Sequence, residues 1–394
     1  MKSLESRLEA VKQHIKNHEI TVMILGLGSV GTYLLDYLVS RNDESMKIIV
    51  VGRSREKMES NVNIVRISAL IRHQNRSEII IEDKVDFNEV DQITECITKY
   101  RPDFIVNSSR VYSGLKYGSI SWNHLRAYGI WTPLSVKYIR NIMEACEAAE
   151  SEAIVINTSY SDAVIPWLKS AGKAYPDFGS GNINHLIPRI KYAAAQICDI
   201  KDFWNIEVAY ATAHFHDVVI SKEGQKEGIQ QLIRVFYEGE ELCVEQDQIF
   251  ALCKIPMPVD QKRNMMNASS NYDIIISIID SLRNSCKEKF FSPGAFGEIG
   301  GYPVIIDAGT ERIQAYVDET VFSLEEMRRA NKESIVLDGI ENVTDGKLVY
   351  TDRLVEKVEE AFGVKLPKSV GFGEIDETAH LIVEEIIIPQ LNKK

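Results

Sequence analysis

Over the first 160 residues, short apolar runs alternate with longer amphipathic stretches. The runs are rich in Ile and Val, as is typical of strands buried on both faces. The stretches between them repeat apolar residues at helical spacing. This alternation predicts an α/β Rossmann domain, a doubly wound parallel sheet with crossover helices. The expected strands are 20–25, 46–52, 78–82, 103–107 and 152–157, and the expected helices are 30–38, 56–73, 88–100 and 133–150.

The second half of the chain mixes strand-like runs with long helical stretches. This order predicts an α+β domain with an antiparallel sheet. Asp345-Gly346 is a hairpin signal, and a last amphipathic helix is expected over 376–388. The expected strands are 205–210, 218–221, 234–237, 302–307 and 312–317, and the expected long helices are 271–289 and 323–340.

These patterns divide the chain into four parts. Residues 1–19 form an amphipathic helix that docks on the body or on a partner subunit. Residues 20–160 form the dinucleotide-binding domain and 161–340 the substrate domain, while 341–394 extend the chain and pack on that second domain. Within the first domain, 111–132 lack clean periodicity. A loop of that length in a compact domain is often a lid over the substrate.

Composition excludes several classes of protein. The chain has 394 residues, 45% of them hydrophobic and 26% charged, which suits a two-domain globular enzyme. Its net charge of −12 argues against sequence-independent nucleic-acid binding, and it has no apolar run long enough for a membrane span. The charged N-terminus does not resemble a signal peptide.

The cysteines indicate the redox environment of the protein. Six are scattered along the chain without a CxxC pair, which predicts a reducing compartment, no zinc site and a cytoplasmic location. They are Cys96, Cys146, Cys198, Cys243, Cys253 and Cys286.

A Gly-x-Gly-x-x-Gly turn follows the first strand. Gly26 permits the tight turn, Gly28 lets a pyrophosphate approach the backbone, and Gly31 lets the next helix pack on the strand. Ser29 and Val30 open that helix, whose free N–H groups attract an anion. The turn therefore predicts a dinucleotide site, the alternative being a purely structural strand–helix turn.

The residues at the end of the second strand indicate which dinucleotide is bound. Enzymes for NAD usually carry Asp or Glu there, for the ribose 2′-hydroxyl. This chain has Arg53, Ser54 and Arg55, which suit a 2′-phosphate, so NADP(H) is expected over NAD(H). The alternative is that both arginines are solvated residues opening the next helix. Asn107 and Ser108, at the end of the fourth strand, are expected beside the nicotinamide half.

Candidate catalytic groups gather beyond the fifth strand. Asn157 ends that strand, Arg189 follows a glycine-rich turn, and His214 lies between two strand-like runs. Together they offer an amide, a guanidinium and an imidazole. His214 and His216, next to Asp217, could also form a metal site, but no metal is expected because no cysteine lies nearby.

At these positions the chain resembles the lactate/malate dehydrogenase superfamily, mostly in order and spacing over about 20–340. The resemblance implies that Arg189 clamps a substrate carboxylate and that His214 exchanges the proton that accompanies hydride transfer. It also implies that Asn157 holds the carboxamide or the substrate oxygen, and that Arg126 is a lid arginine polarising the carbonyl.

The chain departs from that family at several positions. Leu186 stands where the family has the Asp that orients the histidine, and Phe215 follows His214 in place of glycine. Asp217, Asn184 and His185 are the candidates to replace the missing carboxylate, unless the histidine works without one. These departures argue against simple lactate or malate oxidation. Asn184-His185-Leu186 loosely resembles the NAD- and metal-dependent glycosidases, but their Cys-Asn motif is absent.

The sequence thus predicts an NAD(P)-dependent oxidoreductase acting on a carbonyl or hydroxyl of a small, carboxylated substrate. One alternative is an opine- or saccharopine-dehydrogenase-like imine reductase, to which a long lid and a C-terminal extension are suited. Another is an NADP(H)-binding sensor or scaffold without chemistry. A homo-oligomer is expected by analogy of fold.

Overall fold

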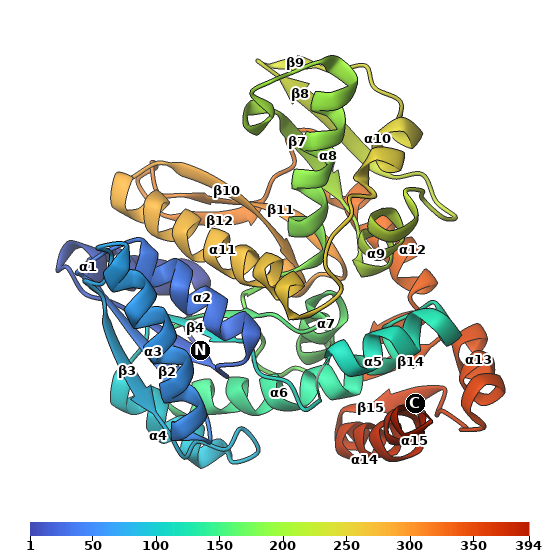
Figure 1. Cartoon of the computed structure of the whole chain (residues 1–394), viewed down its shortest axis with the longest axis horizontal. Helices are drawn as coiled ribbons and strands as arrows, with labels where there is room; N and C mark the ends of the chain where they lie inside the picture. The colour runs from blue at the N-terminus through green and yellow to red at the C-terminus, as the bar shows by residue number, and fades with distance from the viewer. Residues whose placement is uncertain (113, 394) are drawn as a thin grey trace.

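The computed structural model describes residues 1–112 and 114–393. Its centre is a six-stranded parallel sheet in the order β3-β2-β1-β4-β5-β6, the Rossmann topology (Figure 1). The last strand lies beyond the expected domain boundary at 160. The strands are β1 (Ile20–Leu25), β2 (Met46–Val51), β3 (Glu78–Glu82), β4 (Phe104–Asn107), β5 (Ile154–Asn157) and β6 (Phe178–Gly179).

Alternate residues of the strands enter two separate cores. Met23 and Leu25 face the helices α4 and α6, whereas Val22 and Ile24 face α1, α2 and α11. Burial on both faces explains why these strands read as continuous apolar runs. The helices are α1 (Leu4–Lys16), α2 (Ser29–Ser40), α3 (Arg55–Ile71), α4 (Val90–Tyr100), α6 (Thr132–Ala148), α7 (Ser161–Ser170) and α11 (Asn264–Asn284).

The second half contains two three-stranded antiparallel sheets, β10-β11-β12 and β7-β8-β9, as the α+β prediction requires. The strands of these sheets are β7 (Glu207–Ala211), β8 (Leu232–Tyr237), β9 (Glu240–Glu241), β10 (Lys287–Pro293), β11 (Gly301–Asp307) and β12 (Gln314–Val317). The helices beside them are α8 (Asn182–Cys198), α9 (His214–Glu223), α10 (Gln246–Cys253) and α12 (Leu324–Leu337).

Two element predictions in this half are wrong. Residues 218–221 form part of α9 rather than a strand, because this short apolar run packs as one helical face. The predicted helix over 271–289 covers a helix and the start of a strand in the structure, because α11 ends at Asn284 and β10 begins at Lys287. Ser285, in the left-handed conformation, makes the turn between them.

The two ends of the chain pack on the molecule itself. In α1, Leu8, Val11 and Ile15 are buried, and Arg7 pairs with Asp177 beside β6. The C-terminal part forms a third antiparallel sheet, and its α14 lies against α6 (Figure 1). Its β13 also contacts α7 and α12, so the C-terminal part packs on elements of both expected domains. Its elements are β13 (Ile340–Thr344), β14 (Lys347–Tyr350), α13 (Asp352–Phe362), β15 (Ser369–Gly371), α14 (Ile375–Leu381) and α15 (Ile388–Asn392).

The stretch that was expected to be an irregular lid is mostly helical. After residue 113, which lies outside the described residues, it forms α5 (Gly114–Ile120), a π-helical turn (Ser121–Leu125) and a 3-10 turn (Gly129–Trp131). Leu125 and Trp131 are buried among the C-terminal elements. No helix within the described ranges is long and apolar enough to cross a membrane.

Candidate active site

A groove of about 560 Å³ lies at the carboxyl ends of β1, β2 and β4. This is where open α/β sheets bind their ligands. We call it the glycine-rich groove. Of the cofactor residues predicted from the sequence, those that line it are Gly26, Gly28, Ser29, Val30, Arg53, Ser54 and Ser108.

The three glycines of the turn have different reasons to be glycine. Gly26 has a positive φ of +93°, and a Cβ there would lie 3.0 Å from Ser109. A Cβ on Gly31 would lie 2.3 Å from the Gly26 carbonyl oxygen, so helix and strand pack closely there. A Cβ on Gly28 would meet nothing within 4 Å. Protein packing therefore explains Gly26 and Gly31, while Gly28 faces open space at the N-terminus of α2, where a pyrophosphate fits.

The part of the groove that follows β2 is basic. Arg53, Ser54 and Lys57 line it after β2, and the Arg53 side chain is 64% exposed with its nearest carboxylate, Asp86, 3.8 Å away. Arg55 instead points to Asp83, at 3.5 Å, and does not line the groove. The predicted pair of arginines is thus divided, and Lys57, one helical turn from Arg53, is the second cation.

Asn107 and Asn157 lie beneath the groove rather than in it. The Asn107 side chain donates to Asn157 Oδ1 at 2.9 Å, and Asn157 donates to the Ser159 carbonyl at 2.9 Å. Both are buried, and neither reaches a cavity surface. Asn157 therefore shapes the turn after β5 and is a positioning residue, which corrects the direct role expected for it.

A second cavity, of about 470 Å³, adjoins the groove. Arg110, Gly114, Asn264 and Asn267 line both, so the two spaces share a wall. We call it the His214 cavity. It is formed by α5, the turns after β5 and β6, the first turns of α8 and α9, and the start of α11.

His214 lies in this cavity, held by a buried carboxylate from a distant part of the chain. Its Nδ1 lies 3.0 Å from Oδ2 of Asp338, which caps the end of α12 and is fully buried. The Tyr160 hydroxyl donates to the same oxygen at 2.6 Å, and the Tyr128 backbone N–H donates to Oδ1 at 2.6 Å. Nε2 of His214 has no protein hydrogen-bond partner among the described residues, so it is the nitrogen available to a substrate.

The surroundings of His214 favour its charged form. Burial disfavours the imidazolium, but the carboxylates of Asp338, Asp162 and Asp217 together more than offset this, with Asp338 contributing most, so the pKa of His214 is raised. The rings of Tyr128 and Tyr160 flank it edge-on, with centroids at 4.9 and 5.1 Å. His214 is thus oriented by a carboxylate and held protonated to higher pH, which are the properties of a general acid.

Asp162 lies under the same histidine. Its Oδ2 accepts from the His214 backbone N–H at 3.0 Å and from the side chain of Asn182. Burial raises the pKa of Asp162 to about 7, against the opposing effect of His214. Its carboxyl group fixes the start of α9, and hence the place of the imidazole.

A second histidine–carboxylate pair lies across the cavity. His185 Nδ1 is 3.8 Å from Asp217 Oδ2, and both residues line the cavity. Burial lowers the pKa of His185, and Arg189 and Arg263 act in the same direction against Asp217. The cavity therefore holds two imidazoles whose pKa values are displaced in opposite directions.

Two predicted catalytic residues lie outside this cavity. Arg189, one turn along α8 from His185, lines a neighbouring cavity and donates to the Cys253 carbonyl at 2.9 Å. Arg126 pairs with Glu223 at 2.6 Å and with Glu227, and it lines neither the groove nor the cavity. The geometry does not bring either guanidinium to His214, because Arg189 lies one turn farther along α8 and two carboxylates hold Arg126.

The structure also adds residues that sequence reasoning missed. Asp338 has a local signal only as a helix end before Gly339, and nothing near it in the chain points to His214. Lys222 and Arg263 line the cavity as cations, and Arg263 forms no ion pair with any described residue. His216 is fully buried between Ser334 and the Glu227 carbonyl and has a structural role. No cluster of three or more metal-ligating side chains occurs among the residues that could be searched.

Comparison with known proteins agrees with this geometry. Residues 22–117, which carry the glycine-rich groove, match the family described as "Saccharopine dehydrogenase NADP binding domain". The first domain is therefore similar in sequence to the nicotinamide-cofactor-binding Rossmann domain of that family. No curated protein matches the chain significantly.

Solved structures extend the likeness to most of the chain. Malate dehydrogenase from Cryptosporidium parvum superposes with a TM-score of 0.52 at 12% identity, covering 81% of this chain and 98% of that one. Malate dehydrogenase from Aeropyrum pernix gives 0.52 at 15% identity, covering 80% and 97%. Lactate dehydrogenase from Eimeria maxima, solved with NADH and oxamate, gives 0.52 at 13% identity, covering 80% and 92%. The chain is a divergent member of this fold.

Proposed function

We propose that the protein is an NAD(P)-dependent oxidoreductase whose proton donor and acceptor is His214. One observation carries the proposal: the His214–Asp338 pair lies in a cavity that shares a wall with the glycine-rich groove. An oriented imidazole beside a dinucleotide site is the arrangement that a carbonyl reduction requires. The dehydrogenase family match and the dehydrogenase fold support the same class of reaction.

The proposed cofactor is NADP(H). Arg53 and Lys57 supply positive charge where a 2′-phosphate lies, and no Asp or Glu stands at the end of β2. The description of the matching family also names NADP. When bound, the reduced nicotinamide supplies a hydride.

The remaining chemistry belongs to the side chains of the cavity. The proposed substrate is a small molecule with a carboxylate, which Arg263 and Lys222 attract electrostatically. His214 Nε2 hydrogen-bonds the substrate oxygen and gives it a proton as negative charge develops there. Asp338 and Tyr160 keep the ring in place and stabilise its charged form throughout.

A second candidate is an imine reductase that joins an amine to a 2-oxo acid. The saccharopine-dehydrogenase family match favours it specifically. The same His214 then protonates the nitrogen of the imine, or the hydroxyl that leaves as the imine forms.

The test is NADPH oxidation by the purified protein, followed at 340 nm with a panel of 2-oxo acids and aldehydes, each with and without amino acids. Turnover without an amine supports the first candidate, and a strict amine requirement supports the second. NADPH binding without turnover on any member of the panel contradicts both and leaves a nucleotide-binding sensor.

A further inference from the structure

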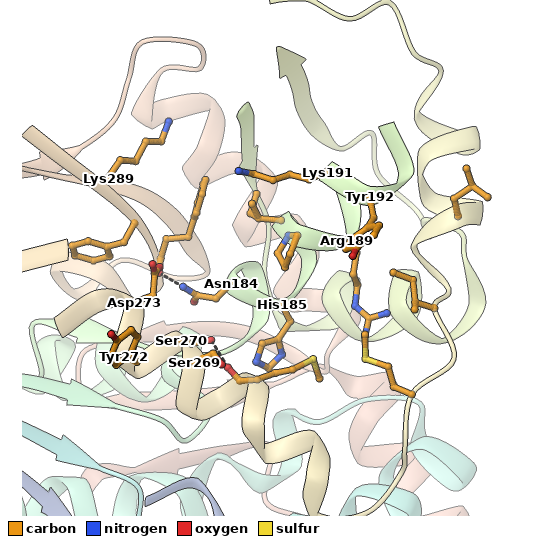
Figure 2. Close-up of a pocket in the computed structure, with 18 of the residues that line it drawn as sticks. Asn184, His185, Arg189, Lys191, Tyr192, Ser269, Ser270, Tyr272, Asp273 and Lys289 are labelled. Atoms are coloured by element: carbon orange, nitrogen blue, oxygen red, sulfur yellow. Dashed lines mark hydrogen bonds between the residues drawn. The ribbon is translucent and has the colours of Figure 1, made fainter. Parts of the chain in front are cut away.

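A third cavity lies apart from the glycine-rich groove and borders the His214 cavity. It has a volume of about 1050 Å³ and lies between α8, α10, α11 and β10. Figure 2 shows side chains from these elements around it. Cavities of roughly 300–1,000 Å³ hold drug-sized ligands, so this space exceeds the needs of a lactate-sized molecule. We call it the α8 cavity.

Among the described residues, two side chains line both the α8 cavity and the His214 cavity. They are His185, from α8, and Met266, from α11. Methionine is unbranched and adapts its shape easily, so this part of the wall can open without moving the backbone. A ligand in the α8 cavity can therefore extend past His185 toward His214.

Three polar side chains on α8 face this cavity with unmet hydrogen-bonding capacity. Asn184 Oδ1, His185 Nε2 and Arg189 Nε are buried atoms without a partner among the described residues. Buried polar atoms in native proteins are nearly always hydrogen-bonded, so a group of three on one wall calls for a ligand or for water. Their chemistry indicates a polar or anionic group on that ligand.

Arg189 is the residue best suited to an anion. Its side chain is buried, and it forms no ion pair with a described carboxylate. Nη1 donates to the Cys253 carbonyl, whereas Nη2 has only the thioether sulfur of Met257, at 3.1 Å. Nε and Nη2 form one edge of the guanidinium, the edge that binds a carboxylate side-on through two hydrogen bonds. One donor on that edge is vacant, and the other has a weak acceptor on a partly exposed side chain.

The other charged groups of the α8 cavity are already compensated. Lys289 pairs with Asp318 at 2.6 Å, and Asp273 interacts with Lys191. The rest of the wall is mainly apolar, with contributions from Ile187, Pro188, Leu252, Ile255, Met257, Met266, Phe290 and Phe291. A cationic anchor in a mainly apolar chamber is the lining that an amphipathic carboxylate requires.

We propose that the α8 cavity binds the body of the substrate, an organic anion with an extended apolar chain or ring. A second carboxylate, remote from the one that Arg263 and Lys222 attract, is held by Arg189, and the reacting end passes His185 to reach His214. The link to His214 rests on the proposed function, whereas the binding site itself does not. The inference assigns Arg189 to a remote part of the substrate, not to the reacting centre.

The probes are octanoate and octanol, which share a chain and differ in charge. Isothermal titration calorimetry on the whole protein should show octanoate binding that falls at least about tenfold in Arg189→Met. Octanol binding should change less than about twofold in that variant, because the apolar wall is intact. Arg76→Met, at an exposed arginine far from the cavity, should leave both affinities unchanged.

A second variant tests the cavity independently, in case Arg189→Met does not fold. Ser269 is exposed on α11 and lines the α8 cavity, so Ser269→Trp should fill the space and weaken both probes. NADPH binding, followed by fluorescence, should be unaffected in both variants. Failure of octanoate to bind, or an affinity indifferent to Arg189→Met and Ser269→Trp, overturns the inference.

Failure of this inference and failure of the proposed function give different results. If the protein has no dehydrogenase activity, octanoate still binds in an Arg189-dependent manner. If the cavity is not the substrate site, turnover proceeds and octanoate does not compete with the carbonyl substrate. If both proposals hold, octanoate raises KM without changing kcat.

Discussion

The glycine-rich groove and the His214 cavity share a wall but are assembled in opposite ways. The groove is made mainly by two consecutive strand–turn–helix units, so its key residues lie between Gly26 and Met58 in the chain. The cavity draws on α5, α7, α8, α9 and α11, and its histidine is oriented by a carboxylate 124 residues away. The shape of the groove is therefore set mainly within the Rossmann domain. The shape of the cavity depends on how the two halves of the chain pack together.

The largest expected effect comes from a variant that changes the His214 cavity and leaves the glycine-rich groove intact. His214→Asn should lower turnover by about a hundredfold to ten-thousandfold, because the proton donor is lost. NADPH affinity should stay within about twofold, since His214 does not line the groove. The measurements are steady-state rates and fluorescence titration of NADPH. His73→Asn, at an exposed residue with positive φ that Asn accepts well, is the control. Retained turnover would remove His214 from the mechanism.

A smaller effect should appear as a shift in the pH dependence of kcat/KM. Because Asp338 raises the pKa of His214, reduction should proceed while the imidazolium persists and decline as pH rises through that raised pKa. In Asp338→Asn the strongest opposition to the effect of burial is lost and only Asp162 and Asp217 remain, so the decline should move to lower pH. The loss should be about tenfold to a hundredfold at pH 8 and smaller at pH 6.

The measurement is the pH profile of kcat/KM, with thermal unfolding to show that the variant is folded. An unshifted profile in Asp338→Asn would mean that another group orients and charges the imidazole.

The smallest effect concerns the groove alone. Arg53→Ala should weaken NADPH binding by about threefold to tenfold and leave NADH unchanged, because an exposed cation contributes modestly to holding a phosphate. Arg55→Ala is the matched control, since Arg55 pairs with Asp83 outside the groove. Equal losses for both cofactors in Arg53→Ala would disprove the 2′-phosphate assignment, which fluorescence titration can decide.

The accuracy of sequence-based prediction followed the same division between regions. The first five Rossmann strands, the helices α2, α3, α4 and α6 and the Asp345-Gly346 hairpin were predicted correctly, because each is specified by a pattern within a short window. Residues 218–221 were mistaken for a strand, since four apolar residues do not distinguish a strand from one buried helical face. The contact of the C-terminal part with α6 was not predicted, because an apolar face does not reveal which surfaces it covers.

For the site, the sequence by itself determined the turn at Gly26–Gly31, the basic character after β2 and the presence of a candidate histidine. These depend on backbone conformation and charge close together in the chain. Only the tertiary structure decided that Asp338 is the partner of His214, and that Arg189 faces a different cavity. The physical reason is that burial and electrostatic pairing depend on distance in space. A carboxylate far along the chain can therefore replace one missing at Leu186, and one helical turn can move an arginine to another chamber.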